Sequence, residues 1–101
     1  MILDDDLNVI VWNPRAEDLW GLRAEEVIGR SLLSLDIGLP VEELGEPLRG
    51  CVNEGQSRRE ITLDAISRRG KSIVVNITFT PFLGGARGVR RGVVMLMVER
   101  E

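Results

Sequence analysis

The second half of the chain contains three strand-like segments joined by short turns, and this pattern limits the possible folds more than any other feature. From Arg59 to Ile66 apolar and polar residues alternate, which is typical of a strand with one buried face. A longer segment runs from Ser72 to Leu83, and a third from about Arg91 to Glu99. The stretches between them are short and contain glycine, as in antiparallel hairpins. We therefore expect three consecutive antiparallel strands.

The first half begins with a predicted hairpin. Ile2 and Leu3 form a short apolar start, and three consecutive aspartates can supply a turn. The segment Asn8–Trp12 is rich in β-branched residues and reads as a strand. The chain therefore has two strands before the helical region and three after it.

Helix signals follow this hairpin. Asn13 can cap a helix, and Pro14 suits the first helical position because it has no amide hydrogen to satisfy. This helix is expected to end at about Trp20, since Gly21 can adopt the left-handed conformation of a helix end. Further short helices are expected at Ala24–Ile28, Pro40–Leu44 and about Glu46 to Gly55, with an apolar loop at Leu32–Ile37.

Composition excludes most enzyme classes. The chain has 101 residues, no His, no Tyr and one Cys, which predicts a single domain spanning residues 1–101. Without His, a Ser-His-Asp triad, a Cys-His pair and a His-ligated zinc site are impossible. With one Cys, no intrachain disulfide can form. We therefore expect a non-enzymatic segment with no catalytic residues and no metal site.

Charge and hydropathy bear on partners and location. The formal net charge is −3, which disfavours nucleic-acid binding, and the arginine clusters beside the predicted turns are interpreted as solvated charges. The longest apolar run, Val93–Val98, is too short to cross a membrane. We therefore expect a cytoplasmic domain with no membrane contact. The abrupt apolar start and the charged end at Glu99–Glu101 are expected of a piece of a longer chain.

Four residues at characteristic positions carry a resemblance to a known family. Asp6 precedes a strand, Asn13 caps the helix after it, and Gly21 and Gly29 follow the first two helices. This order, with three long strands after it, resembles a PAS domain over essentially the whole chain. The stretches Leu19–Leu22 and Leu35–Val41 are similar to the PAS segment attached to bacterial chemotaxis protein-glutamate methyltransferases.

The resemblance implies an α+β fold, in which a five-stranded antiparallel sheet carries short helices on one face. It also implies a sensory role in a larger bacterial signalling protein, with an output domain in the same parent chain. Family members that bind haem usually supply a His, which this chain lacks. The reactive Cys motif of flavin-type members is also absent, because Cys51 lies later, on the long helix. Neither haem nor flavin is therefore expected, and Cys51, Met95 and Met97 are interpreted as core residues.

Between the sheet and its helices the resemblance leaves room for a small apolar ligand. Two interpretations stay open: the apolar side chains line a ligand pocket, or they simply fill the core. The candidate wall residues are Leu33, Leu35, Ile37, Leu48, Val52, Ile61, Leu63, Ile73, Val75 and Ile77.

Two predicted strands, Asn8–Trp12 and Val93–Val98, are apolar on both faces. A strand of this kind must be covered on both faces. In the first, Val9 and Val11 are expected on one face, with Ile10 and Trp12 on the other. With the strand order of the family, they would form one patch opposite the helices, buried in a symmetric homodimer. Its candidate residues are Ile2, Val9, Ile10, Val11, Trp12, Val94, Leu96 and Val98. The alternatives to a sensor are a ligand-free homodimerisation module and a fragment of an enzyme such as a chemotaxis methyltransferase.

Overall fold

A computed structural model describes residues 1–53, 58–83 and 91–100. Five strands and several short helices follow the predicted order. In chain order the strands are β1 (Ile2–Asp4), β2 (Val9–Val11), β3 (Arg59–Ile66), β4 (Ser72–Leu83) and β5 (Arg91–Arg100). The helices are α1 (Pro14–Trp20), α2 (Ala24–Val27) and α3 (Gly45–Asn53), with single 3₁₀ turns at Leu32–Ser34 and Val41–Glu43.

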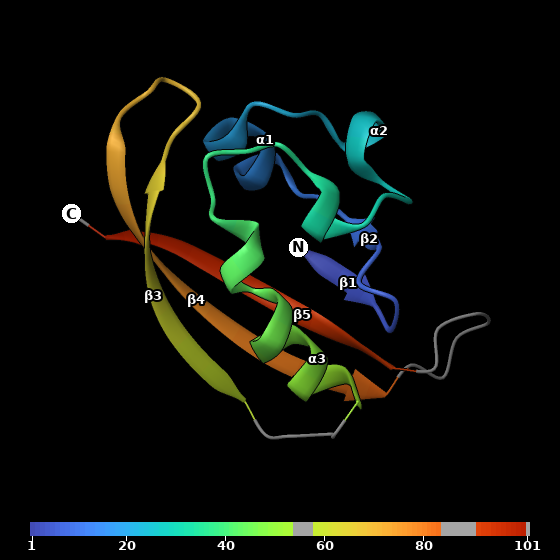
Figure 1. The fold of residues 1–101 in the computed structure, drawn as a ribbon. Helices are drawn as coiled ribbons and strands as arrows, with labels where there is room; N and C mark the ends of the chain where they lie inside the picture. The colour runs from blue at the N-terminus through green and yellow to red at the C-terminus, as the bar shows by residue number, and fades with distance from the viewer. Residues whose placement is uncertain (54–57, 84–90, 101) are drawn as a thin grey trace.

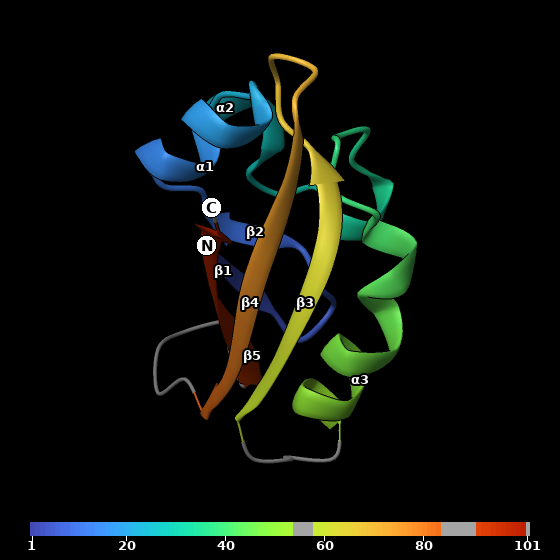
Figure 2. The same cartoon turned by 90° about the vertical axis from the view of Figure 1, so that its left-hand side faces the viewer.

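The strands form one five-stranded antiparallel sheet in the order β2-β1-β5-β4-β3. The first and last thirds of the chain therefore meet at the centre, where β1 lies beside β5. The helices lie over one face of this sheet (Figures 1 and 2). The α+β prediction of a five-stranded sheet with helices on one face is confirmed.

The helix boundaries follow the capping residues. The Asn13 side chain accepts a hydrogen bond from the Ala16 amide at 3.0 Å, so the predicted cap is present. Gly21 has φ of +80°, and its amide donates to the Glu17 carbonyl at 2.9 Å. α2 ends at Val27, one residue earlier than predicted, and α3 begins at Gly45 instead of Glu46. The predicted helix end at Gly55 and the predicted turn at 84–88 lie outside the described residues.

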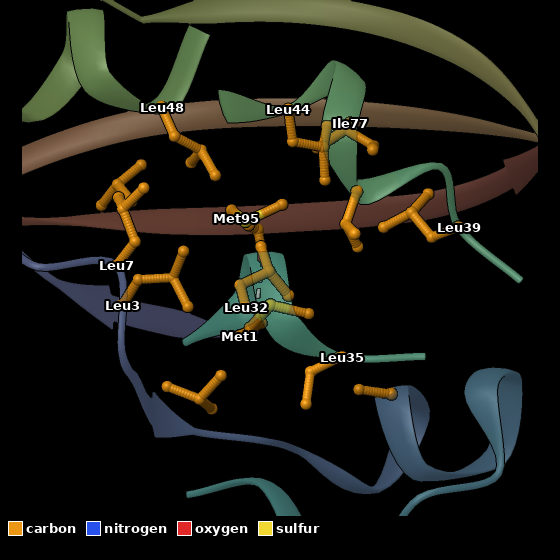
Figure 3. Packing of buried hydrophobic residues seen from close by; sticks show 14 of the residues in the cluster. Met1, Leu3, Leu7, Leu32, Leu35, Leu39, Leu44, Leu48, Ile77 and Met95 are labelled. Atoms are coloured by element: carbon orange, nitrogen blue, oxygen red, sulfur yellow. Dashed lines mark hydrogen bonds between the residues drawn. The ribbon is translucent and has the colours of Figure 1, made fainter. Parts of the chain in front are cut away.

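The core lies between the inner face of the sheet and the helical layer (Figure 3). Its centre is formed by side chains with no exposed surface, including Leu48 from α3, Ile77 from β4 and Leu3 from β1. Ile77 and Phe79 of β4 and Val93 and Met95 of β5 are all buried, so these side chains lie on the face of the sheet that the helices cover. The apolar segment at Leu32–Ile37, predicted as a loop, forms a 3₁₀ turn that buries Leu32 and Leu35 in this core.

An irregularity between β1 and β2 corrects the predicted outer face. Ile2 pairs with Val11 and Leu3 pairs with Val9, so Ile10 is an extra residue on β2. A bulge of this kind breaks the alternation of side chains along a strand. Val9 therefore lies in the core with no exposed surface, while Val11 is 42% exposed on the other side. The prediction that Val9 and Val11 share a face is wrong.

The prediction that Trp12 belongs to the exposed patch on the outer face is also wrong. Its side chain is only 4% exposed, and its indole N–H donates to the Leu22 carbonyl at 2.8 Å. This bond attaches the end of β2 to the segment after α1, because a buried indole N–H needs an acceptor. Trp12 is therefore a core residue, and Ile10 is half-buried within the bulge.

Candidate functional site

The outer face of the sheet, opposite the helices, carries an apolar patch. We define this patch as Ile2, Val11, Val94, Leu96 and Val98. Ile2 pairs with Val11 on one side and with Val94 on the other, so the row crosses three strands without a gap. Leu96 is 60% exposed and Val98 45% exposed, which are high values for large apolar side chains. Contiguous exposed apolar surface usually marks an interaction site.

The patch ends at the boundary between β5 and β4. On β4 the outward residues beside Leu96 and Val98 are Thr78 and Asn76. The Asn76 side chain accepts a hydrogen bond from the Thr62 hydroxyl of β3 at 3.5 Å. The middle of the outer face of β3 and β4 is therefore polar beside the patch, although Ile66 near the end of β3 is 46% exposed.

The predicted pocket wall lies on the inner side of the sheet. Leu35, Leu48, Val52, Ile73, Val75 and Ile77 are buried in the core. Leu33, Ile37, Ile61 and Leu63 are partly buried and pack against it. The structure thus brings all these residues into one apolar cluster, but their role toward a ligand stays a prediction.

A groove of about 1010 Å³ lies at the end of the sheet where β3 and β4 are joined. Ile37 and Ile73 from the predicted wall line it, together with the charged side chains of Glu42, Asp64 and Lys71. These three charged residues are exposed, so the groove opens to solvent. Sequence reasoning did not identify this groove, because it depends on where the segment 37–40 crosses β3.

That crossing is unusually close and needs glycine. The Ile66 amide donates to the Gly38 carbonyl at 2.9 Å. A Cβ atom on Gly38 would lie 1.6 Å from the Ile66 carbonyl oxygen, a distance that no side chain tolerates. Gly38 therefore allows the segment before α3 to close one wall of the groove.

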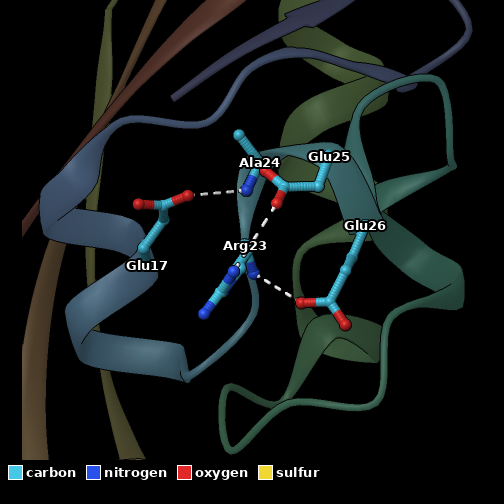
Figure 4. A network of polar contacts seen from close by, with 5 residues as sticks. All are labelled: Glu17, Arg23, Ala24, Glu25 and Glu26. Carbon is cyan, nitrogen blue, oxygen red and sulfur yellow. Dashed lines mark hydrogen bonds and ion pairs between the residues drawn. The ribbon is translucent and has the colours of Figure 1, made fainter.

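The polar contacts between α1 and α2 satisfy backbone amides at the start of α2 (Figure 4). The Glu17 carboxylate accepts from the Ala24 amide at 2.7 Å, and the Glu26 carboxylate accepts from the Arg23 amide at 2.7 Å. Both bonds satisfy amides that have no partner within the first turn of α2. The ion pair between Arg23 and Glu25 spans 3.9 Å with both side chains largely exposed, so it contributes little to stability.

The Cys51 thiol and the aspartates of the β1–β2 turn have structural roles. Burial raises the pKa of the Cys51 thiol, an effect opposed by the positive charge of Arg59. A buried neutral thiol is a poor nucleophile and a poor metal ligand. The carboxylates of Asp4, Asp5 and Asp6 lie near one another. Asp4 accepts from the amides of Asp6 and Asn8, both at 2.9 Å, so it holds the β1–β2 turn.

Among the described residues, no helix combines the length and apolar character needed to cross a membrane.

Comparisons with known proteins agree with this architecture. A family model described as a PAS domain matches residues 1–100. The chain is similar to the PAS domain of histidine kinase ThkA, with 28% sequence identity and a TM-score of 0.73. That match covers 96% of this chain and 93% of the other. No curated protein matches the chain.

Two further solved structures share the fold at lower identity. A Vibrio cholerae VqmA dimer, solved without its target DNA, has 20% identity and a TM-score of 0.81, and the match covers 99% of this chain but 44% of VqmA. The PAS domain of the Cronobacter turicensis quorum-sensing receptor RpfR, in complex with BDSF, has 22% identity and a TM-score of 0.65. That match covers 97% of this chain and 88% of the other.

Proposed function

The chain belongs to the PAS domain family, and from this premise we propose that it is a sensory domain of a larger bacterial signalling protein. The observation that carries the proposal is the family match over residues 1–100, supported by 28% identity to the PAS domain of a histidine kinase. In this proposal the domain is cytoplasmic and passes a conformational signal to an output domain in the same parent chain. The two outputs that we propose are a kinase and a chemotaxis methyltransferase.

We propose that the domain itself is non-catalytic and holds no coloured cofactor. The chain has no His, and its one thiol is buried with a raised pKa. The net charge of −3 supports a domain that does not contact nucleic acid or a membrane. The absorbance spectrum of the purified protein tests the cofactor statement, because haem or flavin at near-stoichiometric level would contradict it.

We propose that the signal travels through a homodimer formed on the apolar patch. Two copies of the patch can pack against each other, because apolar surfaces exclude water when they come into contact. A two-fold symmetric dimer would bury Leu96 against the same region of its partner. The polar outer surface of β3 and β4 would remain in water at the edge of the contact.

The signal that this domain senses is the second part of the proposal. VqmA has been solved bound to DPO, and the RpfR PAS domain in complex with BDSF. By analogy we propose a small apolar ligand between the sheet and the helices of this domain, within the cluster that contains Leu48, Val75 and Ile77. Binding there would have to displace core side chains, which would couple the ligand to the position of the sheet.

A ligand-free homodimerisation module is the second candidate, and core packing favours it. Leu48, Val75 and Ile77 have no exposed surface, so the wall side chains already contact one another. Native mass spectrometry separates the two candidates. A stoichiometric extra mass supports the sensor and contradicts the ligand-free module, whereas a bare mass is compatible with both, since a bound ligand can be lost during purification.

A chimeric kinase tests the signalling proposal directly. This chain would replace the PAS domain of histidine kinase ThkA, and autophosphorylation would be measured for the chimera and for its Leu96→Glu variant. A signalling domain is expected to sustain activity that Leu96→Glu lowers, because the charge opposes burial of the patch. The matched control is Thr62→Glu on the polar half of the same face. Equal activity in all three proteins would contradict the proposal.

A further inference from the structure

The two tryptophans of the chain differ in how their indole N–H groups are satisfied. Trp12 is buried, and its Nε1 donates to the Leu22 carbonyl at 2.8 Å. Trp20 is only 5% exposed, and its Nε1 is fully buried but forms no hydrogen bond with any residue that the structure describes. A buried indole N–H normally has an acceptor, because an unpaired buried donor is unfavourable. Trp20 therefore places an unused hydrogen-bond donor inside the protein.

Helix α1 positions this indole in the core. Ala16 and Trp20 are the two buried residues of α1, and they share one face of the helix because they are four positions apart. Trp20 belongs to the same cluster of buried side chains as Leu35, Leu48 and Ile77, which are candidate wall residues. The unpaired N–H thus lies in the apolar layer where the ligand is proposed to bind.

Backbone contacts place Trp20 at the end of the sheet that carries the groove. The Arg68 amide, in the turn between β3 and β4, donates to the Leu19 carbonyl of α1 at 3.0 Å. The Ile66 amide donates to the Gly38 carbonyl at 2.9 Å, and both residues line the groove. Two views of the fold show α1 beside this turn (Figures 1 and 2). Trp20 follows Leu19 directly, so it lies at the same end of the sheet.

The groove and the core share side chains at this end. Leu39 and Ile73 line the groove and are also buried members of the cluster. Ile37 lines the groove and packs against the cluster. Because Leu39 is 2% exposed, a molecule in the groove contacts Trp20 only after core side chains move. A hydrogen bond to the buried indole would offset part of the free energy that this movement requires.

The composition of the core determines which ligand chemistry fits. In the described part of the chain, the only buried polar or charged residue is Thr78, which lies on the outer face beside Leu96. No buried cationic side chain can therefore balance a carboxylate there, and an unbalanced charge in an apolar interior is strongly unfavourable. The candidate wall residues are all aliphatic, so they offer no acceptor to a ligand O–H or N–H. A neutral carbonyl without donor hydrogens is the group that matches.

We propose that the sensed ligand is a neutral apolar ketone or ester, and that its carbonyl oxygen accepts a hydrogen bond from Nε1 of Trp20. This inference rests on the ligand-sensing role proposed above, and it adds the chemical class of the ligand and the residue that selects it. Trp20 favours a carbonyl compound over a hydrocarbon of the same shape, because only the carbonyl compound pairs with the buried N–H. The aliphatic side chains of the cluster contact the rest of the ligand.

The indole N–H resonances in a ¹H–¹⁵N NMR spectrum test the proposal on the unmodified protein. The chain has two Trp, so the variants Trp12→Phe and Trp20→Phe assign both resonances. The probes are cyclohexanone and methylenecyclohexane, which have nearly the same shape and differ in the carbonyl group. Cyclohexanone is expected to move the Trp20 N–H resonance downfield, as hydrogen bonding does, and to leave the Trp12 resonance in place. Methylenecyclohexane is expected to cause no downfield movement.

The same two variants form a matched pair for binding. The measured quantity is the affinity for cyclohexanone divided by the affinity for methylenecyclohexane, because this ratio removes most of the contribution of molecular shape. Trp20→Phe keeps an aromatic ring and removes the N–H, so it is expected to lower the ratio at least about tenfold. Trp12→Phe removes the N–H that already bonds to Leu22 and is expected to leave the ratio unchanged.

Three outcomes would overturn the proposal. The first is an unchanged Trp20 resonance at millimolar cyclohexanone. The second is a nuclear Overhauser effect between the Trp20 N–H and water that persists with cyclohexanone, which would assign the donor to a bound water molecule. The third is an equal change of the affinity ratio in both variants.

These outcomes are distinct from a failure of the sensory role. A ligand that native mass spectrometry detects, but that leaves the Trp20 resonance unchanged, would overturn this inference and leave the sensory role intact. If Trp20→Phe does not fold, the resonance of the unmodified protein still decides the question.

Discussion

The outer face of the sheet has two halves that differ in chemistry although they belong to one continuous sheet. On β5, β1 and β2 the outward side chains are apolar, and Leu96 and Val98 are 60% and 45% exposed. In the middle of β4 and β3 they are polar, where Thr62 bonds to Asn76, although Ile66 near the end of β3 is 46% exposed. The boundary falls between paired residues, since Leu96 lies beside Thr78. Burial of this face by a partner would therefore remove more apolar surface from water on the β5 side than on the β3 side.

Both halves of the outer face share one buried core on the inner side of the sheet. The largest predicted effect comes from truncating a side chain in this core. Ile77 on β4 has no exposed surface and pairs with Ile61 of β3 and Met97 of β5. Ile77→Ala is expected to lower the free energy of unfolding by about 2–5 kcal/mol, the usual result of truncating a buried aliphatic side chain. Urea denaturation measures it. The control is Thr80→Ala, an exposed change on the same strand expected within about 0.5 kcal/mol of the unmodified protein. Equal effects of both would contradict the assignment of faces.

A charge on each half tests the difference between them. Leu96→Glu is expected to raise the dimer Kd at least about tenfold, or about 1.4 kcal/mol, because burial would desolvate the carboxylate. Analytical ultracentrifugation at micromolar concentration measures the Kd. Thr62→Glu adds the same charge to the polar half and is expected to leave the Kd unchanged. A monomeric unmodified protein, or equal weakening by both variants, would contradict the dimer on the apolar patch.

The division between the halves was partly predictable from the sequence. The sequence of β5 is apolar on both faces, with Val93, Met95 and Met97 on one and Val94, Leu96 and Val98 on the other, which predicted an apolar outer surface; in the structure Val93 and Met95 are buried and Leu96 and Val98 are exposed. The caps were also predictable, because Asn13 and Gly21 act through local backbone geometry. Strict alternation failed at β2. The bulge at Ile10 is set by pairing with β1, and the sequence of β2 gives no sign of it.

The remaining features depend on contacts between distant segments. The groove beside Gly38 exists because the segment 37–40 crosses the end of β3. The candidate wall residues lie in the core on the inner side of the sheet, and the pocket itself stays a prediction. Its function could not be derived, since the same apolar residues can line a pocket or fill a core.

A substitution in the helix cap of α1 is expected to lower the free energy of unfolding without changing either half of the outer face. Asn13→Ala removes the acceptor for the Ala16 amide and is expected to lower the free energy of unfolding by about 1 kcal/mol. Urea denaturation measures this change, and the dimer Kd should stay the same, because α1 lies on the other face. The control is Arg15→Ala, an exposed change in the same turn. An unchanged midpoint for Asn13→Ala would contradict the role of this cap.

The smallest predicted effect concerns the residue before β1, where the Met1 ammonium donates to the Met95 carbonyl of β5 at 3.2 Å. Burial lowers the pKa of the Met1 ammonium below its ordinary value of 8.0. Between the lowered value and 8.0 the unfolded chain binds more protons than the folded chain, so the free energy of unfolding rises with pH across this window and levels off above it. The chain has no His, so no unperturbed side chain is expected to titrate strongly in the same range. Urea denaturation from about pH 6 to about pH 9 measures the slope. The N-terminally acetylated protein is the control, because it keeps every side chain and loses only this titration. Identical slopes for the two proteins would show that the ammonium is not buried against Met95.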